Sequence, residues 1–372
     1  MPENKGRVLY AGGFELPDRN AAAHRVLNNA KILKALGYDV VFCGVDNEIA
    51  AFSSTPNDIL GFESYPMPYP KSAKAWVKQM CDISAYVTLI EKYSDIKFIF
   101  AYNLHALPLA KLLRLAKKKG IRVIADCTEW YENKFSINPV KLIKCFDTVL
   151  CMRYFQKKCD GMIAISTYLR DYYKKHIKSI LVLPPLVDLN DARYYQSCKG
   201  KNAITTLCYC GSPAASKESL GEVITCLNSF EGLDFKLKIV GITEEQFCTI
   251  YGFAPQNNKI EFLGRIPHSQ ALELVKTADY SVIIRPKKRV TMAGFPTKFA
   301  EAVSCNTAVI ANATSDLADY IKVGKNGHIV RLESLSDDLY KIIADGNLPT
   351  VETDTFDYKN WVSDFDDFLN NF

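Results

Sequence analysis

Two successive series of short apolar, β-branched segments run along the chain, and segments with helical periodicity separate their members. The first series comprises residues 7–11, 39–44, 97–102, 121–126, 161–166 and 179–184, and the second comprises residues 206–211, 235–241, 259–264, 280–285 and 308–311. Strands that alternate with helices in this way predict a parallel sheet with helices on both faces. We therefore predict an α/β chain of two doubly wound domains, residues 1–190 and 200–350, joined between Pro185 and Lys201.

Residues 351–372 predict a C-terminal helix with one apolar face. The side chains on that face are Tyr358, Trp361, Phe365, Phe368 and Leu369. Such a face requires a partner surface, and we predict that the helix packs back on the first domain. Ligands of parallel α/β sheets bind outside the carboxyl ends of the strands, so two such domains facing one another would form a cleft between their loops.

The composition is that of a globular protein with more than one core. Of the 372 residues, 48% are hydrophobic and 23% are charged. The formal net charge of +5 is too small for a dedicated nucleic-acid-binding protein, but it is compatible with an anionic ligand or an anionic membrane face. Twelve cysteines occur without a Cys-x-x-Cys pair, which is typical of buried thiols in a reducing compartment. Because the N-terminal residues lack a secretory signal and no apolar stretch reaches about 18 residues, we expect a cytoplasmic protein without a transmembrane helix.

Two common nucleotide-binding motifs, Gly-x4-Gly-Lys-Ser/Thr and Gly-x-Gly-x-x-Gly, are missing from the sequence. P-loop and ordinary dinucleotide enzymes are therefore disfavoured. The first predicted strand is instead followed by Gly12 and Gly13, where either a ligand approaches the backbone closely or the chain makes a tight turn. Gly13 is thus a candidate ligand contact. Arg25, in the helix that follows, either lines the cleft or lies on the surface.

In the second half, candidate phosphate-binding residues follow the ends of predicted strands. Gly211, Ser212 and Lys217 follow the strand at residues 206–211, and Lys217 there either reaches a diphosphate or is a solvated lysine at a helix start. Arg265 follows the strand at residues 259–264 and is either a further phosphate contact or an exposed loop arginine.

Residues 293–311, AGFPTKFAEAVSCNTAVIA, predict a loop, a short helix and an apolar strand. Pro296, Thr297 and Lys298 form a helix start whose free N–H groups attract anions. Glu301, one turn further on, would repel an anion, but its carboxylate accepts hydrogen bonds from hydroxyls. A ligand that carries both phosphates and hydroxyls, such as a nucleotide sugar, satisfies both groups.

From Gly211 to residue 330, the order and spacing of these motifs resemble those of the retaining glycosyltransferases of family 4, which have the GT-B fold of two facing Rossmann-like domains. In that family, two glutamates separated by seven residues frame the donor site. Glu301 matches the second glutamate, and Ala293 occupies the position of the first. The resemblance implies that Glu301 binds ribose hydroxyls. It also places the end of the helix at Asn306, where the family commonly has glycine and where asparagine tolerates a left-handed backbone.

The resemblance further implies retention at the anomeric carbon. Lys217, the helix start at residues 296–298 and Arg265 would stabilise the leaving diphosphate, a role that a metal ion has in other glycosyltransferases. A metal-dependent enzyme would use an Asp-x-Asp pair after a strand. The only such spacing is at residues 364–366, inside the predicted terminal helix. We therefore expect no catalytic metal and no cofactor, with a nucleoside diphosphate sugar as the donor substrate.

The first domain is expected to bind the acceptor. Glu129 follows the fourth predicted strand together with Trp130 and Tyr131, whose aromatic faces suit a sugar. A loop packed on the core is the alternative interpretation of this segment. His105 follows the third predicted strand and is either a catalytic group or a structural hydrogen-bonding residue. Lys217, Glu129 and His105 are therefore the candidate catalytic residues.

These observations predict a hexosyltransferase that moves a hexose-type sugar to a hydroxyl of a glycan or lipid-linked acceptor, in the synthesis of a surface polysaccharide or glycolipid. The alternatives are a nucleotide-sugar epimerase on the same fold and a catalytically silent GT-B module, which Ala293 favours. We expect no nucleic-acid partner.

Basic and apolar stretches at residues 111–120, 141–146 and 172–178 suggest peripheral attachment of the first domain to the inner face of the membrane. An ordinary crossover helix, with its leucines against the sheet, is an equally good interpretation of the first stretch.

Overall fold

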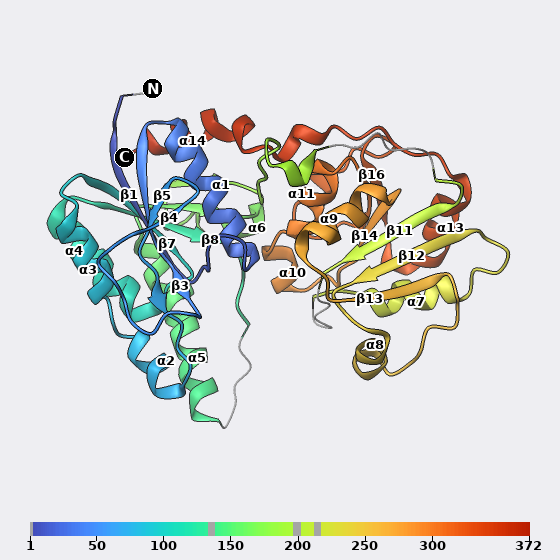
Figure 1. The fold of residues 1–372 in the computed structure, drawn as a ribbon, viewed down its shortest axis with the longest axis horizontal. Helices are drawn as coiled ribbons and strands as arrows, with labels where there is room; N and C mark the ends of the chain where they lie inside the picture. The colour runs from blue at the N-terminus through green and yellow to red at the C-terminus, as the bar shows by residue number, and fades with distance from the viewer. Residues whose placement is uncertain (1–2, 133–137, 196–201, 212–216) are drawn as a thin grey trace. The chain divides into compact units, whose positions relative to one another are not determined.

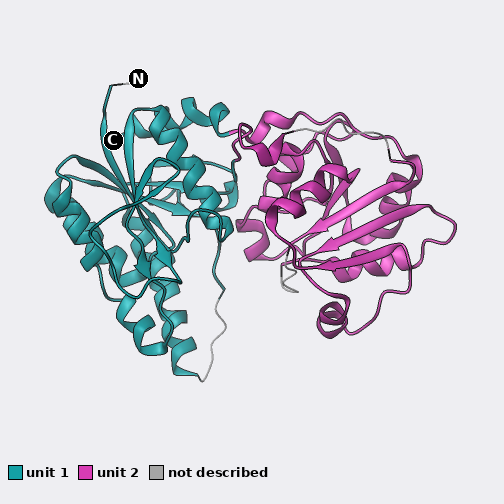
Figure 2. Cartoon of the chain, in the orientation of Figure 1, with its two compact units in different colours: residues 1–186, 358–372 teal, residues 187–357 magenta. Residues whose placement is uncertain are grey.

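The computed structural model describes residues 3–132, 138–195, 202–211 and 217–372. The chain forms two compact units (Figure 2). Unit 1 comprises Met1–Leu186 and Tyr358–Phe372, and unit 2 comprises Val187–Asp357. Each unit is built on its own predominantly parallel sheet, as predicted from the two series of apolar segments.

Within the described residues, unit 1 contains an eight-stranded sheet of order β10-β9-β8-β7-β1-β2-β5-β4 (Figure 1). Its strands are β1 Gly6–Gly12, β2 Tyr38–Cys43, β4 Asn57–Ile59, β5 Phe62–Ser64, β7 Ile96–Tyr102, β8 Arg122–Cys127, β9 Gly161–Ala164 and β10 Ser179–Val182, and β3 Val45–Asp46 pairs with β6 Met67–Pro68 in a second small sheet. All pairs are parallel except β4 with β5. The six longer strands were predicted; β3 to β6 were not, because two or three residues carry no readable apolar period.

The α-helices of unit 1 connect these strands, except for the C-terminal helix α14. They are α1 Ala21–Ala35, α2 Ala73–Gln79, α3 Ser84–Lys92, α4 Ala106–Lys119, α5 Pro139–Leu150, α6 Thr167–Tyr173 and α14 Val362–Leu369. The C-terminal helix α14 packs on the core of this unit, since Phe365, Phe368 and Leu369 are buried there. The Phe365 ring stacks on that of Phe100 in β7, with centroids 6.1 Å apart. The predicted apolar face therefore packs on the first domain.

A buried polar cluster lies at the centre of unit 1. Asp126, at the end of β8, accepts hydrogen bonds from the Tyr10 hydroxyl at 2.5 Å and from Arg25 Nε at 2.8 Å. Arg25 Nη1 also donates to the carbonyl of Leu183 at 3.0 Å. The suggestion that Arg25 lines a cleft or lies on the surface is therefore wrong. It is buried because a buried carboxylate requires a charged partner and further hydrogen bonds.

Unit 2 has a six-stranded parallel sheet of order β13-β12-β11-β14-β15-β16 within the described residues. Its strands are β11 Thr205–Cys210, β12 Phe235–Val240, β13 Ile260–Gly264, β14 Tyr280–Ile283, β15 Ala308–Asn312 and β16 Gly327–Val330. Its helices are α7 Leu220–Asn228, α8 Glu244–Tyr251, α9 His268–Thr277, α10 Arg289–Ala293, α11 Thr297–Ser304, α12 Leu317–Tyr320 and α13 Leu335–Asp345. The chain proceeds outward from β11 to β13 and then returns to the other side of β11 with β14, so the strand order reverses between β11 and β14. Ligands of such sheets bind at this switch point.

The cysteines in the described parts of the chain are free thiols, most of them buried, as expected for a protein without a disulfide framework. No helix among the described residues combines the length and apolar character that crossing a membrane requires.

Candidate functional site

The switch point of unit 2 brings together the loops after β11 and β14. The loop after β11 begins at Gly211, whose φ of 147° is one that other residues rarely adopt. Lys217 and Glu218 follow on the same connection, and Ser212 lies outside the described residues. Lys217 is half-buried. The first predicted phosphate-binding group therefore lies where the topology expects a ligand.

Helix α11 begins after β14, at the same edge of the sheet. Pro296 is its N-cap residue, one position before the first helical residue Thr297. No side chain among the described residues caps this end. The first N–H groups of the helix therefore remain available to an anion. The helix is followed by Asn306 with φ of 56°, so the predicted left-handed backbone at this residue is confirmed.

Lys298 is held by a buried ion pair. Its Nζ lies 2.8 Å from Glu218 Oε2 and 4.2 Å from the centre of the Tyr209 ring. A Cβ at Gly211 would lie 3.9 Å from the same Nζ. Burial lowers the pKa of Lys298, while the carboxylate of Glu218 opposes that shift. The ammonium group is thus placed at the loop that carries Lys217, but its charge is already matched by Glu218.

Glu218 was not identified from the sequence. It directly follows the candidate Lys217, but its partner lies 80 positions further along the chain. A glutamate at a helix start is ordinarily explained by its interaction with the helix dipole. No local sequence pattern distinguishes such a glutamate from one that forms a buried ion pair.

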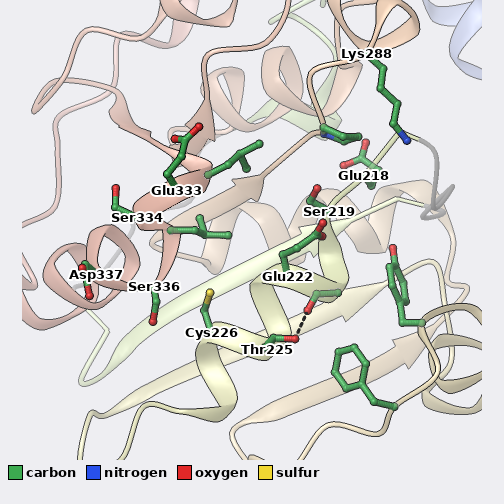
Figure 3. A pocket seen from close by; sticks show the side chains of 16 residues that line it. Glu218, Ser219, Glu222, Thr225, Cys226, Lys288, Glu333, Ser334, Ser336 and Asp337 are labelled. Atoms are coloured by element: carbon green, nitrogen blue, oxygen red, sulfur yellow. Dashed lines mark hydrogen bonds between the residues drawn. The ribbon is translucent and has the colours of Figure 1, made fainter.

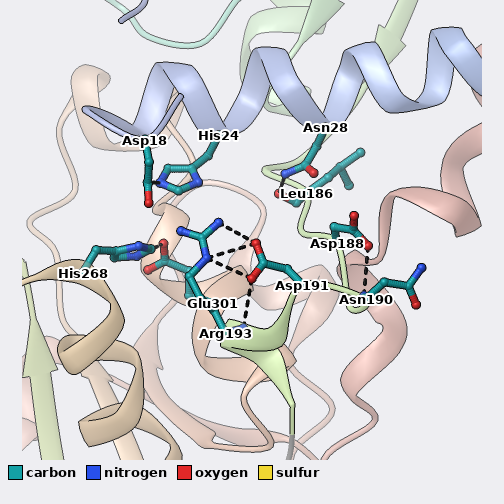
Figure 4. Close-up of polar contacts among 10 residues, drawn as sticks. All are labelled: Asp18, His24, Asn28, Leu186, Asp188, Asn190, Asp191, Arg193, His268 and Glu301. Carbon is teal, nitrogen blue, oxygen red and sulfur yellow. Dashed lines mark hydrogen bonds and ion pairs between the residues drawn. The ribbon is translucent and has the colours of Figure 1, made fainter. Parts of the chain in front are cut away.

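Glu301 lies one turn into α11 and contacts a histidine from another element (Figure 4). Its Oε1 is 3.1 Å from Nε2 of His268, the first residue of α9. When the carboxylate is ionised, this contact requires the proton on Nε2, because a carboxylate can only accept hydrogen bonds. His268 was also missed, because a single histidine at a helix start is not a recognisable motif.

The position of the family's first glutamate is enclosed in this chain. Ala293, the last residue of α10, is completely buried. The surrounding turn is held by Arg285, whose Nη1 donates to the carbonyl oxygens of Gly294 at 3.0 Å and Thr291 at 3.3 Å. Residue 293 therefore offers a ligand no side-chain oxygen.

Arg265 lies at a greater distance from the switch point. It follows β13, which is two strands away from β11, or about 10 Å at the usual strand spacing. The side chain is exposed. The contact between His268 and Glu301 shows that the segment after β13 nevertheless extends to α11. Arg265 is thus a candidate for the periphery of the site.

A cavity of about 690 Å³ opens beside Glu218, between the first turns of α7 and α13 (Figure 3). Its charged lining residues are Glu218, Glu222, Glu333, Asp337 and Lys288. Four carboxylates and one lysine disfavour a diphosphate. The candidate anion-binding groups of unit 2 are therefore the start of α11 and Lys217, rather than this cavity.

Unit 1 contains a cavity of about 500 Å³ at the carboxyl edge of its own sheet. Gly13, His105 and Tyr131 all contribute to its lining, so three of the predicted positions come together. They follow β1, β7 and β8, and the strand order of this sheet reverses between β1 and β7. Glu129 is half-buried but is not part of the lining, and Trp130 is buried with its ring 4.8 Å from that of Tyr172. The alternative of a loop packed on the core therefore holds for Trp130.

Glycine occurs at positions 12 and 13, near the end of β1, for different structural reasons. Gly12 has φ of 154°, and a Cβ there would overlap the carbonyl group of Tyr102, so no side chain fits. A Cβ at Gly13 would meet no atom within 4 Å. The neighbouring backbone therefore requires glycine at position 12, while Gly13 borders open space in the cavity.

His105 is oriented by a carboxylate. Its Nδ1 lies 2.7 Å from Oδ2 of Asp147, whose Oδ1 accepts the backbone N–H of Ala106 at 2.8 Å. The His105 ring also packs edge-on against Trp76, with centroids 5.7 Å apart. With the Nδ1 proton directed at Asp147, Nε2 is the basic nitrogen. The pair can therefore accept a proton from a hydroxyl bound in the cavity.

Comparisons with known proteins agree with this architecture. Residues 217–351 match the family model described as glycosyl transferases group 1. A search of curated proteins found no match.

Solved structures that resemble this chain include three glycosyl-transfer or sugar-binding proteins. The sucrose-phosphate synthase of Thermosynechococcus elongatus superposes with a TM-score of 0.72 at 13% identity, covering 98% of both chains. The HepE protein of Anabaena, in complex with UDP and glucose, has a TM-score of 0.64 at 12% identity and covers 99% of this chain and 100% of its own. The lipopolysaccharide outer core galactosyltransferase WaaB, in its apo form, has a TM-score of 0.63 at 12% identity over 98% of this chain and 99% of its own.

The family match covers the segment that contains Lys217, Lys298 and Glu301, and the structural resemblance extends over nearly the whole chain. The structural resemblance establishes the fold, and the family match supports glycosyl transfer as the reaction. Both agree with the resemblance to family 4 found in the sequence. We conclude that the chain has the GT-B fold and that its residues 217–351 match the glycosyl transferases of group 1.

Proposed function

We propose that the enzyme transfers a hexose from a uridine diphosphate sugar to an acceptor hydroxyl, with retention at the anomeric carbon and without a metal ion. The observation that carries the proposal is the arrangement of α11 in unit 2. Its uncapped N-terminus would donate backbone N–H groups to the diphosphate. Glu301, one turn further on, would accept hydrogen bonds from hydroxyls. A uridine nucleotide is supported by HepE, whose structure holds UDP and glucose.

The diphosphate is the leaving group of this reaction. The bond between the anomeric carbon and the diphosphate oxygen breaks, and the acceptor oxygen forms a new bond to that carbon. The leaving negative charge is stabilised by the N–H groups at the start of α11, by Lys217 and by Arg265. Glu301, held by His268, accepts hydrogen bonds from the ribose hydroxyls. The acceptor hydroxyl loses its proton in the same reaction, and His105 is our candidate to receive it.

The cavity of unit 1 is proposed to bind the acceptor. Its lining combines polar groups with the aromatic side chains of Tyr69, Trp76, Tyr86 and Tyr131, a combination suited to sugar rings. We propose a glycan or lipid-linked acceptor, in the synthesis of a surface polysaccharide or glycolipid, with the enzyme peripherally bound to the membrane. The galactosyltransferase WaaB, of similar fold, acts on lipopolysaccharide outer core according to its name.

A donor screen tests the proposal. Purified enzyme is incubated with a panel of nucleoside diphosphate sugars, with and without candidate acceptors, and both nucleotide and sugar products are identified. Transfer predicts nucleotide release together with a glycosylated acceptor of retained configuration. An altered free sugar without any acceptor would indicate the epimerase.

The alternative of a catalytically silent module rests on a specific structural observation. The enclosed Ala293 lacks the family's first carboxylate, which favours a silent module. Nucleotide binding without turnover of any donor in the panel would support that alternative and would contradict the proposed transfer.

A further inference from the structure

Helix α5 in unit 1 presents an apolar face to solvent. Five of its side chains are 40% to 53% exposed. Ile143, Phe146 and Leu150 lie on one side of the helix, and Val140 and Val149 flank them; we call these five side chains the α5 face. Within the helix only Cys145 is buried. A surface helix ordinarily turns its apolar stripe inward, so a helix with this many exposed apolar side chains indicates an interaction surface.

The other two basic and apolar stretches of unit 1 do not share this feature. Helix α4, which includes most of residues 111–120, buries Leu112 and Ala116 against the sheet, as an ordinary crossover helix does. In residues 172–178, Tyr173 and Ile177 are buried. Of the three stretches suggested by the sequence for membrane contact, only residues 141–146 expose large apolar groups.

Cationic side chains surround the α5 face. Exposed lysines and arginines occur on α2, on α5 and on the segments next to them: Lys71, Lys74, Lys78, Lys141, Lys144 and Arg153. Across residues 71–79 and 139–154 the sequence has a single carboxylate, Asp147, which is bonded to His105. The surface is therefore cationic, and a second copy of it would be repelled by like charge.

Helix α5 also borders the proposed acceptor cavity with its other side chains. Lys144, Asp147 and Thr148 of α5 and Trp76 of α2 line that cavity. Tyr69, which lines it too, is 49% exposed. A planar partner that contacts α5 would consequently lie next to this cavity.

We propose that the α5 face docks on an anionic lipid leaflet and so presents the unit 1 cavity to the headgroup of a lipid-linked acceptor. The inference rests on the proposed function for the identity of the acceptor. Apolar side chains of a helix lying in the membrane plane enter the boundary between headgroups and acyl chains, while flanking lysines are attracted by anionic lipid. Both features are present here on one helix.

Vesicle flotation tests this docking with the full chain. Phosphatidylcholine vesicles with and without phosphatidylglycerol are compared at low and moderate salt. The wild type is expected to float with the anionic vesicles only, and less at the higher salt. Ile143→Glu/Phe146→Glu should weaken that binding by about tenfold or more, because carboxylates are repelled by the leaflet and do not enter it. The matched control, Ile250→Glu/Val323→Glu, places the same charges on exposed apolar positions of unit 2 and should bind as the wild type does.

Two controls separate this inference from the proposed function. The thermal melting temperature of the α5 variant, and its transfer to a water-soluble acceptor without vesicles, should equal those of the wild type. Absence of transfer by a wild type that still floats would count against the function alone. The proposed docking would be overturned if the wild type did not float with anionic vesicles, or if the α5 variant floated as well as the wild type. Self-association that is lost in the α5 variant would overturn it too, and would assign the face to a contact between copies.

Discussion

Replacing Glu218 with glutamine removes one charge from the buried pair at the candidate donor site of unit 2. The side chains of Lys298 and Glu218 are only 13% and 11% exposed, and their charged atoms are 2.8 Å apart. Glutamine has nearly the shape of glutamate and can still accept a hydrogen bond from the ammonium group. The substitution therefore isolates the charge from the packing and the hydrogen bond.

The expected cost follows from leaving a buried ammonium without its counter-ion. Removing one partner of a buried pair costs about 3 to 5 kcal/mol. The ring of Tyr209, 4.2 Å from the Lys298 Nζ, retains a cation–π attraction, so we expect the lower end of that range. For a unit of this size, about 3 kcal/mol corresponds to a melting temperature lower by roughly 6 to 12 °C. The double variant Glu218→Leu/Lys298→Met, which removes both charges, should recover most of that loss.

The loss should depend on pH in a defined direction. Burial places the pKa of Lys298 below its usual value in the folded protein, and Arg285 lowers it further, whereas Glu218 and Cys210 raise it. Between that lowered pKa and the usual value near 10.5, the unfolded chain binds more protons than the folded one, so stability rises with pH in this window. Without Glu218 the folded pKa falls further and the window extends to lower pH. The deficit of the variant should therefore shrink as the pH is raised from neutral to alkaline.

Thermal unfolding followed by circular dichroism, at a series of pH values, measures both effects. The wild type, Glu218→Gln and the double variant are compared in the same buffers. An unchanged melting temperature for Glu218→Gln at neutral pH, or a deficit that grows with pH, would refute the assignment of a buried ion pair.

Four further predictions follow from the site geometry. Lys217→Ala should lower kcat/KM by roughly tenfold to 150-fold, the equivalent of about 1.5 to 3 kcal/mol for a charge-assisted contact; an equally active, folded variant would remove Lys217 from the site. Glu301→Ala should raise the dissociation constant of the nucleotide about tenfold in calorimetry, and equal affinity would contradict the ribose contact. Activity should survive EDTA, whereas complete loss restored by manganese or magnesium would establish a metal requirement. Gly13→Ala should fold with an unchanged melting temperature, while Gly12→Ala should destabilise unit 1, because only the latter Cβ overlaps the Tyr102 carbonyl; equal melting temperatures would contradict this distinction.

Most of the fold was predictable because its signals are local. A buried parallel strand is an apolar run, and an amphipathic helix repeats with a period of 3.6 residues, so β1, β11 and the face of α14 could be identified without knowing their partners. The left-handed Asn306 was predictable for the same reason, since the backbone tolerance belongs to the residue itself. The short strands β3 to β6 have too few residues to show a period.

The candidate site was predictable only in part. The predicted phosphate-binding start of α11 and its Glu301 are neighbours in sequence, so their spacing could be read directly. The role of Trp130 could not be predicted, because a tryptophan after a strand either faces a ligand or packs on the core. Only its contact with Tyr172 distinguishes these two roles.

The sequence by itself determined the α/β class and two predominantly parallel sheets, and it predicted a nucleotide-sugar chemistry, because these depend on the order of elements along the chain. Tertiary structure alone decided that Lys298 is matched by Glu218, that Glu301 contacts His268 and that α5 leaves its apolar face exposed. The physical reason is that charge compensation and burial depend on what folding places within a few ångströms of a side chain. Those neighbours come from positions 33 and 80 residues away, at separations that no local period encodes.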